Sequence, residues 1–170
     1  MKALIGLGSN LEQPTDRLTQ ALQALQHLPG ITLDRHSRLY RSAPVGPQDQ
    51  PDFINAVAQL NTTLSPLTLL LTLQAVELAA GRVRRRHWGE RTLDLDILLI
   101  DDRIIDLPAL QVPHPHLTGR AFVLVPLLEI APGACLPDGT PLSSRLAGVE
   151  DQVIEPLTEL PCDALIERTD

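Results

Sequence analysis

Aromatic residues are almost missing from this 170-residue sequence, which contains one Trp, one Tyr and two Phe residues. The core must therefore be built from Leu, Ile, Val and Ala. Three of the aromatic residues, Phe53, Trp88 and Phe122, lie beside polar or charged segments and not within the Leu-rich stretches. This placement favours a flat ligand that stacks against rings. Chance placement at the ends of helices and strands is the alternative.

Cysteine and long apolar runs are also scarce. Cys135 and Cys162 lie far apart in the sequence and match no redox or zinc spacing, which favours two reduced thiols. No apolar run reaches the roughly 18 residues that a membrane helix needs. The apolar run after Lys2 is too short for a signal peptide. These absences predict a cytoplasmic protein that does not bind a membrane.

Positive charge is scarce overall and dense in one segment. The net charge of −7 argues against a nucleic-acid partner. One short stretch nonetheless holds Arg82, Arg84, Arg85, Arg86 and Arg91. Because a guanidinium group binds phosphate in a planar, bidentate way, this stretch favours a small phosphate-bearing ligand and a lid that closes over it. A solvated charge run is the alternative, and the tryptophan within the stretch argues against it.

Hydrophobic periodicity and turn signals predict an α+β fold in a single domain. Strands are expected at 3–7, 31–41, 53–63 and 93–100, with another short one near 104–105, and helices at 14–28, 66–80 and 121–130. Residues 44–52 contain three prolines and cannot be regular structure. The order of elements predicts a ferredoxin-like antiparallel sheet with its helices on one face.

The remaining segments give weaker signals. Residues 1–140 are expected to form the main body, with 141–170 as a C-terminal helix and tail packed on it or trailing from it. Gly6 and Gly8 lack the Gly-Lys-Ser/Thr ending of a phosphate loop, so we expect them to allow the turn out of the first strand. Four histidines are expected at the surface: His27, His36, His87 and His116.

Two aspartates give the sharpest functional signal. Asp94 and Asp96 alternate with Leu93 and Leu95, so both carboxylates lie on one face of a strand, about 7 Å apart at the backbone. Aspartate is disfavoured in strands. Two carboxylates in this arrangement can hold magnesium, which usually shares its coordination shell with phosphate. A solvated outer face is the alternative, but the arginines nearby favour a metal and a triphosphate.

Other polar residues stand out by their surroundings. Gln74 and Glu77 are three residues apart on a strongly apolar helix and therefore share a face. His114 and His116 alternate in a way that could suit zinc, but no third ligand is evident in the sequence. A single imidazole of His114 that donates to phosphate is the favoured interpretation.

The segments that carry these residues resemble the 6-hydroxymethyl-7,8-dihydropterin pyrophosphokinase family. The resemblance extends from the first strand to about residue 138, and its matching runs are 8–11, 46–55, 81–84, 88–97, 112–114 and 120–122. The run Arg-Thr-Leu-Asp-Leu-Asp-Ile at 91–97 is highly specific. The resemblance implies a ferredoxin-like fold, residues 1–140 as the pyrophosphokinase domain, and transfer of pyrophosphate from ATP to the pterin hydroxymethyl group with release of AMP, in folate biosynthesis.

The resemblance also implies a role for each matching residue. Asp94 and Asp96 would hold two Mg²⁺ ions, with Asp96 as the favoured base, while Arg82 and Arg91 would stabilise charge on the transferred group. The nucleotide side would comprise Gln74, Glu77, Arg82, Arg84, Arg91, Ile97, His114 and Arg120. The pterin would lie between Phe53 and Phe122, near Asn55, Trp88 and the backbone at Ser42, Ala43 and Val45.

Three positions depart from the family pattern. His87 stands where many relatives have arginine, Glu90 replaces a common proline, and Pro115 replaces a common aromatic residue after His114. A ferredoxin-like module that binds RNA or protein through the arginine stretch, and a non-catalytic small-ligand domain, are the alternatives. Neither would need paired aspartates beside arginines. We expect a monomer whose partners are ATP and the hydroxymethyl dihydropterin.

Overall fold

The computed structural model describes residues 1–11, 13–81 and 92–157. Predicted site residues outside the described ranges are Arg82, Arg84, Trp88 and Arg91, and His87 and Cys162 also lie outside them. Within the described ranges no helix is long and apolar enough to span a membrane.

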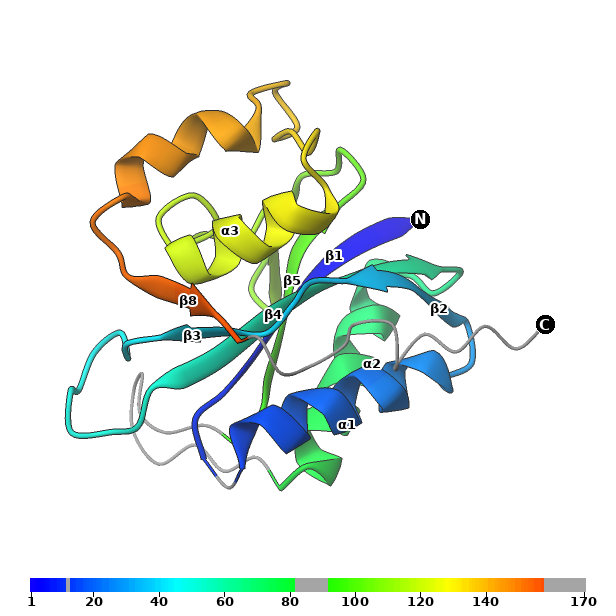
Figure 1. Cartoon of the computed structure of the whole chain (residues 1–170). Coiled ribbons are helices and arrows are strands. Elements are labelled where there is room, and N and C mark those ends of the chain that lie inside the picture. Colours follow the sequence, from blue (N-terminus) through cyan, green and yellow to red (C-terminus); the bar gives the residue numbers. More distant parts are fainter. Residues whose placement is uncertain (12, 82–91, 158–170) are drawn as a thin grey trace.

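The centre of the fold is an antiparallel sheet (Figure 1). Strand β1 (Lys2–Ser9) lies between β4 (Phe53–Thr62) and the edge strand β5 (Asp94–Ile100). Both β2 (Ile31–His36) and β3 (Tyr40–Ser42) pair with β4, and β8 (Ile154–Pro156) pairs with β3. A separate hairpin joins β6 (Ile105–Leu107) to β7 (Leu110–Val112).

Helices cover both faces of this sheet. Figure 1 shows α1 (Pro14–Gln26) and α2 (Pro66–Ala79) below it, and α3 (Ala121–Ile130) above it. The α1/α2 side packs against inward residues such as Ile5 and Leu60. A second core joins α3 and the 3₁₀-helix η1 (Leu142–Val149) to the opposite face of the strands.

The α+β antiparallel fold is therefore confirmed, whereas the expected placement of all helices on one face is wrong. Alternate residues of a strand point to opposite faces, and the centre of this sheet carries apolar side chains on both faces: Ala58 joins the α1/α2 core, whereas Val57 joins the α3 core with Leu4 of β1 and Leu98 of β5. A sheet that is apolar on both faces needs a helical layer on each.

Local signals placed α2 correctly. Ser65 accepts a hydrogen bond from the Thr68 N–H at 3.3 Å, Pro66 opens the helix, and Gly81 follows the C-cap with φ of +79°.

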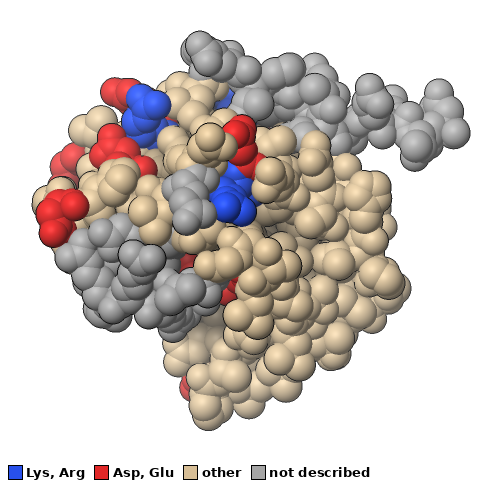
Figure 2. All heavy atoms as spheres, turned by 90° about the horizontal axis from the view of Figure 1, so that it is seen from below, with Lys and Arg blue, Asp and Glu red and all other residues tan. Residues whose placement is uncertain are grey.

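Figure 2 views the α1/α2 side, where a wide area carries no charged residue. On α2 the only charged residue, Glu77, is buried.

Two parts of the chain differ from expectation. The predicted strand 31–41 is broken because Ser37 turns into the sheet, where its Oγ accepts from the Val57 N–H at 3.0 Å. His36, expected at the surface, is buried, with Nδ1 2.8 Å from the Ser37 carbonyl oxygen. Residues 154–156, expected in a surface tail, form β8 and extend the sheet beyond β3.

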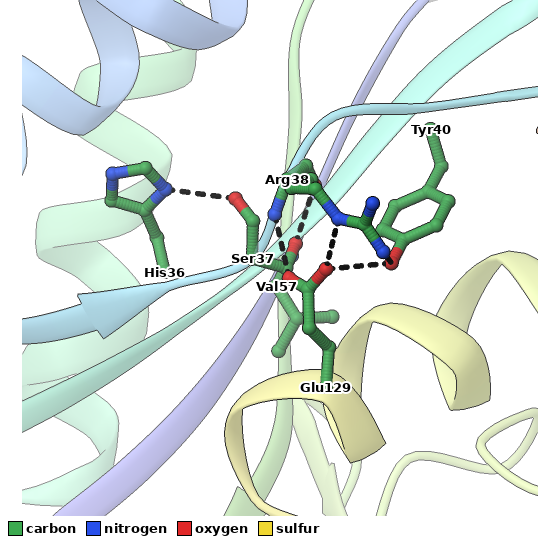
Figure 3. A network of polar contacts seen from close by, with 6 residues as sticks. All are labelled: His36, Ser37, Arg38, Tyr40, Val57 and Glu129. Carbon is green, nitrogen blue, oxygen red and sulfur yellow. Dashed lines mark hydrogen bonds and ion pairs between the residues drawn. The ribbon is translucent and has the colours of Figure 1, made fainter. Parts of the chain in front are cut away.

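A polar network ties α3 to the region around β3 (Figure 3). Glu129 accepts 2.7 Å hydrogen bonds from the backbone N–H and Nε of Arg38 and from the hydroxyl of Tyr40. Burial acts to raise the pKa of the Glu129 carboxyl, but these hydrogen bonds outweigh burial and hold that pKa below its ordinary value. The carboxylate form of Glu129 is thus the form that the fold stabilises.

We expect Glu129→Gln to lower the free energy of unfolding at pH 7 by roughly 1 kcal/mol, the scale of partly hydrated hydrogen bonds. A pKa that is lower in the folded state adds stability above the unfolded-state value, about 4.3, and loses it as pH falls through the folded value. The difference between wild type and variant should therefore shrink below about pH 4. Urea unfolding of both proteins between pH 7 and pH values below about 4 measures this difference in the free energy of unfolding.

Glu155→Gln is the matched control, since Glu155 is an exposed carboxylate on the neighbouring strand β8. Its substitution should leave the free energy of unfolding nearly unchanged at pH 7. An equal loss for Glu129→Gln at every pH would contradict the role given to the ionised carboxylate.

Candidate functional site

A pocket of about 110 Å³ lies on the α3 side of the sheet. It brings together ten predicted site residues: Asp94, Asp96, His114, Arg120, Ser42, Ala43, Val45, Phe53, Asn55 and Phe122. They come from β3, β4, β5, α3 and the loops that follow β3 and β7. The second helical layer, which the sequence did not predict, therefore forms one wall of the pocket.

The two aspartates reach the pocket because β5 alternates. Leu93 and Leu95 are buried in the α1/α2 core, while Asp94 and Asp96 line the pocket on the other face. Within the described part of the chain no group of three or more His, Cys, Asp or Glu side chains could hold a metal ion. A divalent cation at this pair would take further oxygen ligands from substrate or water, which suits magnesium.

Glycines of β1 lie beside both aspartates. Gly8 pairs with Asp94 and Gly6 pairs with Asp96, and both glycines line the pocket within the strand. A Cβ atom at Gly8 would lie 3.3 Å from Oδ1 of Asn55. The expectation that these glycines allow a turn is therefore wrong: β1 runs on to Ser9, and the missing side chains leave the pocket floor open.

Asn55 is held in a defined orientation. Its Nδ2 donates to Oγ of Ser42 at 2.8 Å, and both residues are buried. Phe53 lies two residues earlier on β4, so it points to the same face. This leaves Oδ1 of Asn55 as an acceptor beside the ring of Phe53.

Residues 43–52, which follow β3, are fixed by contacts that the sequence did not predict. Nδ2 of the buried Asn10 donates to Oε1 of Gln50 at 2.9 Å and to the Pro51 carbonyl at 3.0 Å. Oγ of Ser9 donates to the carbonyl of Thr92, just before β5. Residues at the end of β1 therefore connect the loop after β3 to the start of β5, and both segments border the pocket. In the sequence, only the family-matching run 8–11 pointed to these residues.

His114 presents a neutral ring to the pocket. Its backbone N–H donates to the Leu98 carbonyl at 3.0 Å, and its Nδ1 accepts from the His116 N–H at 3.1 Å. The ring proton is then on Nε2, which can donate to an anion. Burial, followed by the positive charge of Arg120 and the effect of His116, lowers the pKa of His114 to about 4.

Arg120 and Phe122 lie at the start of α3. The guanidinium carbon of Arg120 is 5.4 Å from the centroid of the Phe122 ring, within cation–π range. Burial lowers the pKa of Arg120, and the charges of Asp96 and Asp94 oppose that effect. The pocket thus places one cation between two carboxylates and an aromatic ring.

Three predicted nucleotide residues lie elsewhere. Glu77 is buried behind β5, where its Oε1 accepts from the Leu95 N–H at 2.8 Å. Gln74 is exposed on α2, and Ile97 is buried in the α1/α2 core. None of the three lines the pocket. Through its hydrogen bond with the Leu95 N–H, Glu77 supports the backbone between the two aspartates.

The pocket gathers two carboxylates, a guanidinium group and two aromatic rings on one face of the sheet, and comparisons with known proteins identify the family. The family model for 7,8-dihydro-6-hydroxymethylpterin-pyrophosphokinase (HPPK) matches residues 4–132. A 2-amino-4-hydroxy-6-hydroxymethyldihydropteridine pyrophosphokinase of Pseudomonas aeruginosa is 51% identical over 92% of this chain and 96% of its own length. The Haemophilus influenzae enzyme of the same name is 53% identical over 80% of this chain and 85% of its own.

Solved structures show the same fold. A crystal structure of a Plasmodium falciparum HPPK-DHPS triple mutant superposes with a TM-score of 0.68 at 14% identity. The match covers 86% of this chain and 42% of the solved one. This chain therefore spans less than half of that larger protein, and the likeness concerns the fold alone.

The chain belongs to the 7,8-dihydro-6-hydroxymethylpterin-pyrophosphokinase family. It is an ATP-dependent diphosphotransferase that transfers pyrophosphate to hydroxymethyldihydropterin in folate biosynthesis. The family and reaction expected from the sequence are confirmed. A non-catalytic module that binds RNA, protein or a small ligand is set aside.

We expect the ring of His114 to stay neutral between pH 8 and 5, because its pKa is lowered to about 4. NMR of the histidine-labelled protein, with His114→Asn for assignment, measures the titration. Arg120→Met should raise the pKa only part of the way to the ordinary value, about 6.5, since burial is the first cause of the shift. A wild-type midpoint near 6.5 would contradict the half-buried, neutral ring.

Proposed function

We propose that the pocket holds the pterin between Phe53 and Phe122, with its hydroxymethyl group toward Asp94 and Asp96. The observation that supports this most directly is that both rings and both carboxylates line one pocket. Offset stacking on two rings would orient the flat bicyclic ring. Oδ1 of Asn55, fixed by the bond to Ser42, would accept from its edge, and Ala43, Val45 and Trp88 would complete the pterin side.

Asp94 and Asp96 are the residues that would hold two Mg²⁺ ions. When bound, these ions supply charge neutralisation for the triphosphate and lower the pKa of the attacking hydroxyl. The donor set fits: two carboxylates share one strand face, with the remaining ligands left to phosphate and water. The number of Mg²⁺ ions, two, is what the family resemblance implies.

The reaction forms one phosphorus–oxygen bond, breaks another and moves one proton. The hydroxymethyl oxygen of the pterin attacks the β-phosphorus of ATP, and the bond from that phosphorus to the bridging oxygen of the α-phosphate breaks. AMP leaves with the bridging oxygen, and Asp96 takes the hydroxyl proton. His114, through its Nε2–H, and Arg120 would bind phosphate oxygens, while Arg82 and Arg91 would stabilise charge on the transferred group.

The other nucleotide residues stay predictions. Arg84 lies outside the described residues, and Gln74 and Ile97 do not line the pocket. For Glu77 the contact with Leu95 favours support of the metal-binding strand. The boundary at residue 140, the monomeric state and a cytoplasmic location also stay predictions.

We expect Asp96→Asn to reduce kcat at least about a hundredfold, because it removes both a metal ligand and the proton acceptor. The assay measures AMP release from ATP with Mg²⁺ and the hydroxymethyl dihydropterin. Asp106→Asn is the control, since Asp106 is exposed on β6. Chelation of the metal should abolish turnover, and added Mg²⁺ should restore it. Full activity of Asp96→Asn would overturn the assignment.

Gly8→Ala tests the pterin side. Its Cβ would lie 3.3 Å from Oδ1 of Asn55 and displace an acceptor that Ser42 holds from the other end. We expect the KM for the pterin to rise about tenfold, since small misplacements of positioned groups are costly. The control is Gly133→Ala, whose Cβ would meet nothing within 4 Å. An unchanged pterin KM for Gly8→Ala would remove Asn55 from the recognition site.

A further inference from the structure

The C-terminal segment 142–157 packs beside the pocket, although the family match ends at residue 132. Leu142 and Val149 of η1 are buried against α3. After η1, strand β8 pairs with β3, where Ile154 lies opposite Ser42, a residue that lines the pocket. The segment therefore runs from one wall of the pocket, α3, to the other wall, β3.

Between η1 and β8, the side chain of Gln152 clamps the start of α3. Its Oε1 accepts from the Ala121 N–H at 2.8 Å, and its Nε2 donates to the Gly119 carbonyl at 2.9 Å. Ala121 is the first residue of α3, and the first N–H groups of a helix have no acceptor within it. Because the N-cap residue Arg120 gives no side-chain cap, Gln152 supplies the acceptor from another part of the chain.

The two hydrogen bonds lie on either side of Arg120. The Arg120 carbonyl is also engaged, accepting from the N–H groups of Val123 at 3.1 Å and Leu124 at 3.0 Å. Hydrogen bonds thus hold the backbone at Gly119, Arg120 and Ala121. Arg120, the middle residue, lines the pocket. Phe122 lies two residues after Arg120, and its ring packs against that guanidinium.

Packing alone does not fix this end of the helix. A cleft of about 520 Å³ adjoins the pocket and is lined by residues that include Val45, Gly119, Phe122 and Gln152. Where side chains leave such space, hydrogen bonds carry more of the positioning. Gln152 itself is anchored, because its backbone N–H donates to the Val149 carbonyl at 3.0 Å and β8 begins two residues later.

We propose that Gln152 is a positioning residue for the pterin site, acting through the backbone at 119–121 to place Arg120 and Phe122. The inference rests on the pterin-binding role proposed above for Phe122. It assigns the C-terminal segment, which lies beyond the residues that the family model matches, a part in substrate recognition.

The first test is Gln152→Met, which keeps the length of the side chain and removes both hydrogen bonds. We expect the KM for the hydroxymethyl dihydropterin to rise about threefold to tenfold, the range for loss of a helix N-terminal hydrogen bond, with a smaller change in kcat. Gln152→Glu keeps an acceptor for Ala121 but no donor for Gly119, so its effect should be smaller. Gln23→Met, at an exposed position of α1, should change neither constant.

A double-mutant cycle with Phe122→Ala separates positioning from stability. If Gln152 acts through Phe122, Gln152→Met should no longer raise the pterin KM when Phe122 is already Ala. A purely structural role would give the same fold-change in both backgrounds and would overturn the inference, as would a wild-type KM for Gln152→Met. If Phe122→Ala alone leaves the pterin KM unchanged, the proposed function of the pocket fails instead.

Discussion

The alternation of side chains along β5 is the constraint on which the site depends. Leu95 and Ile97 enter the α1/α2 core, whereas Asp94 and Asp96 face the pocket. A register slip of one residue would turn both carboxylates into that core and both apolar side chains into the pocket. Since an unpaired buried carboxylate is costly, the core itself holds the acid pair in place. Glu77 adds to this by bonding the N–H between the two aspartates.

The sheet can serve as a pocket floor because it is covered on both sides. The α1/α2 layer buries one face and fixes β5, and α3 stands over the other face only in part. Phe122 and Arg120 come from the start of α3, while its far end is tied to the β3 region by Glu129. One helix is thus held to the β3 region at its C-terminal end and lines the pocket at its N-terminal end.

Features that a single strand or helix encodes could be predicted from the sequence. The Asp-Leu-Asp alternation, the Ser65-Pro66 start of α2 and the unusual positions of Phe53 and Phe122 each depend on a few neighbouring residues. Features that depend on pairing could not. Gly6 and Gly8 gain their meaning from the register that sets them opposite Asp96 and Asp94, which only the folded sheet defines. The second helical layer was missed because the β4 face that carries Val57 also carries Asn55 and Gln59. Such a mixed face is typical of a sheet surface that meets water and does not reveal that a helix covers it.

The pocket is arranged before any substrate arrives, because its polar groups satisfy one another. Asn55 donates to Ser42, and Nδ1 of His114 accepts from the His116 N–H, while outside the pocket lining Asn10 donates to Gln50. Among the described residues, the one buried side-chain nitrogen or oxygen without a partner is Nε2 of His36, on β2 and away from the pocket lining. Rotamers fixed by such bonds lose little entropy on binding. Recognition can then draw on stacking and charge, in keeping with the proposal that two of the few aromatic rings in this chain contact one ligand.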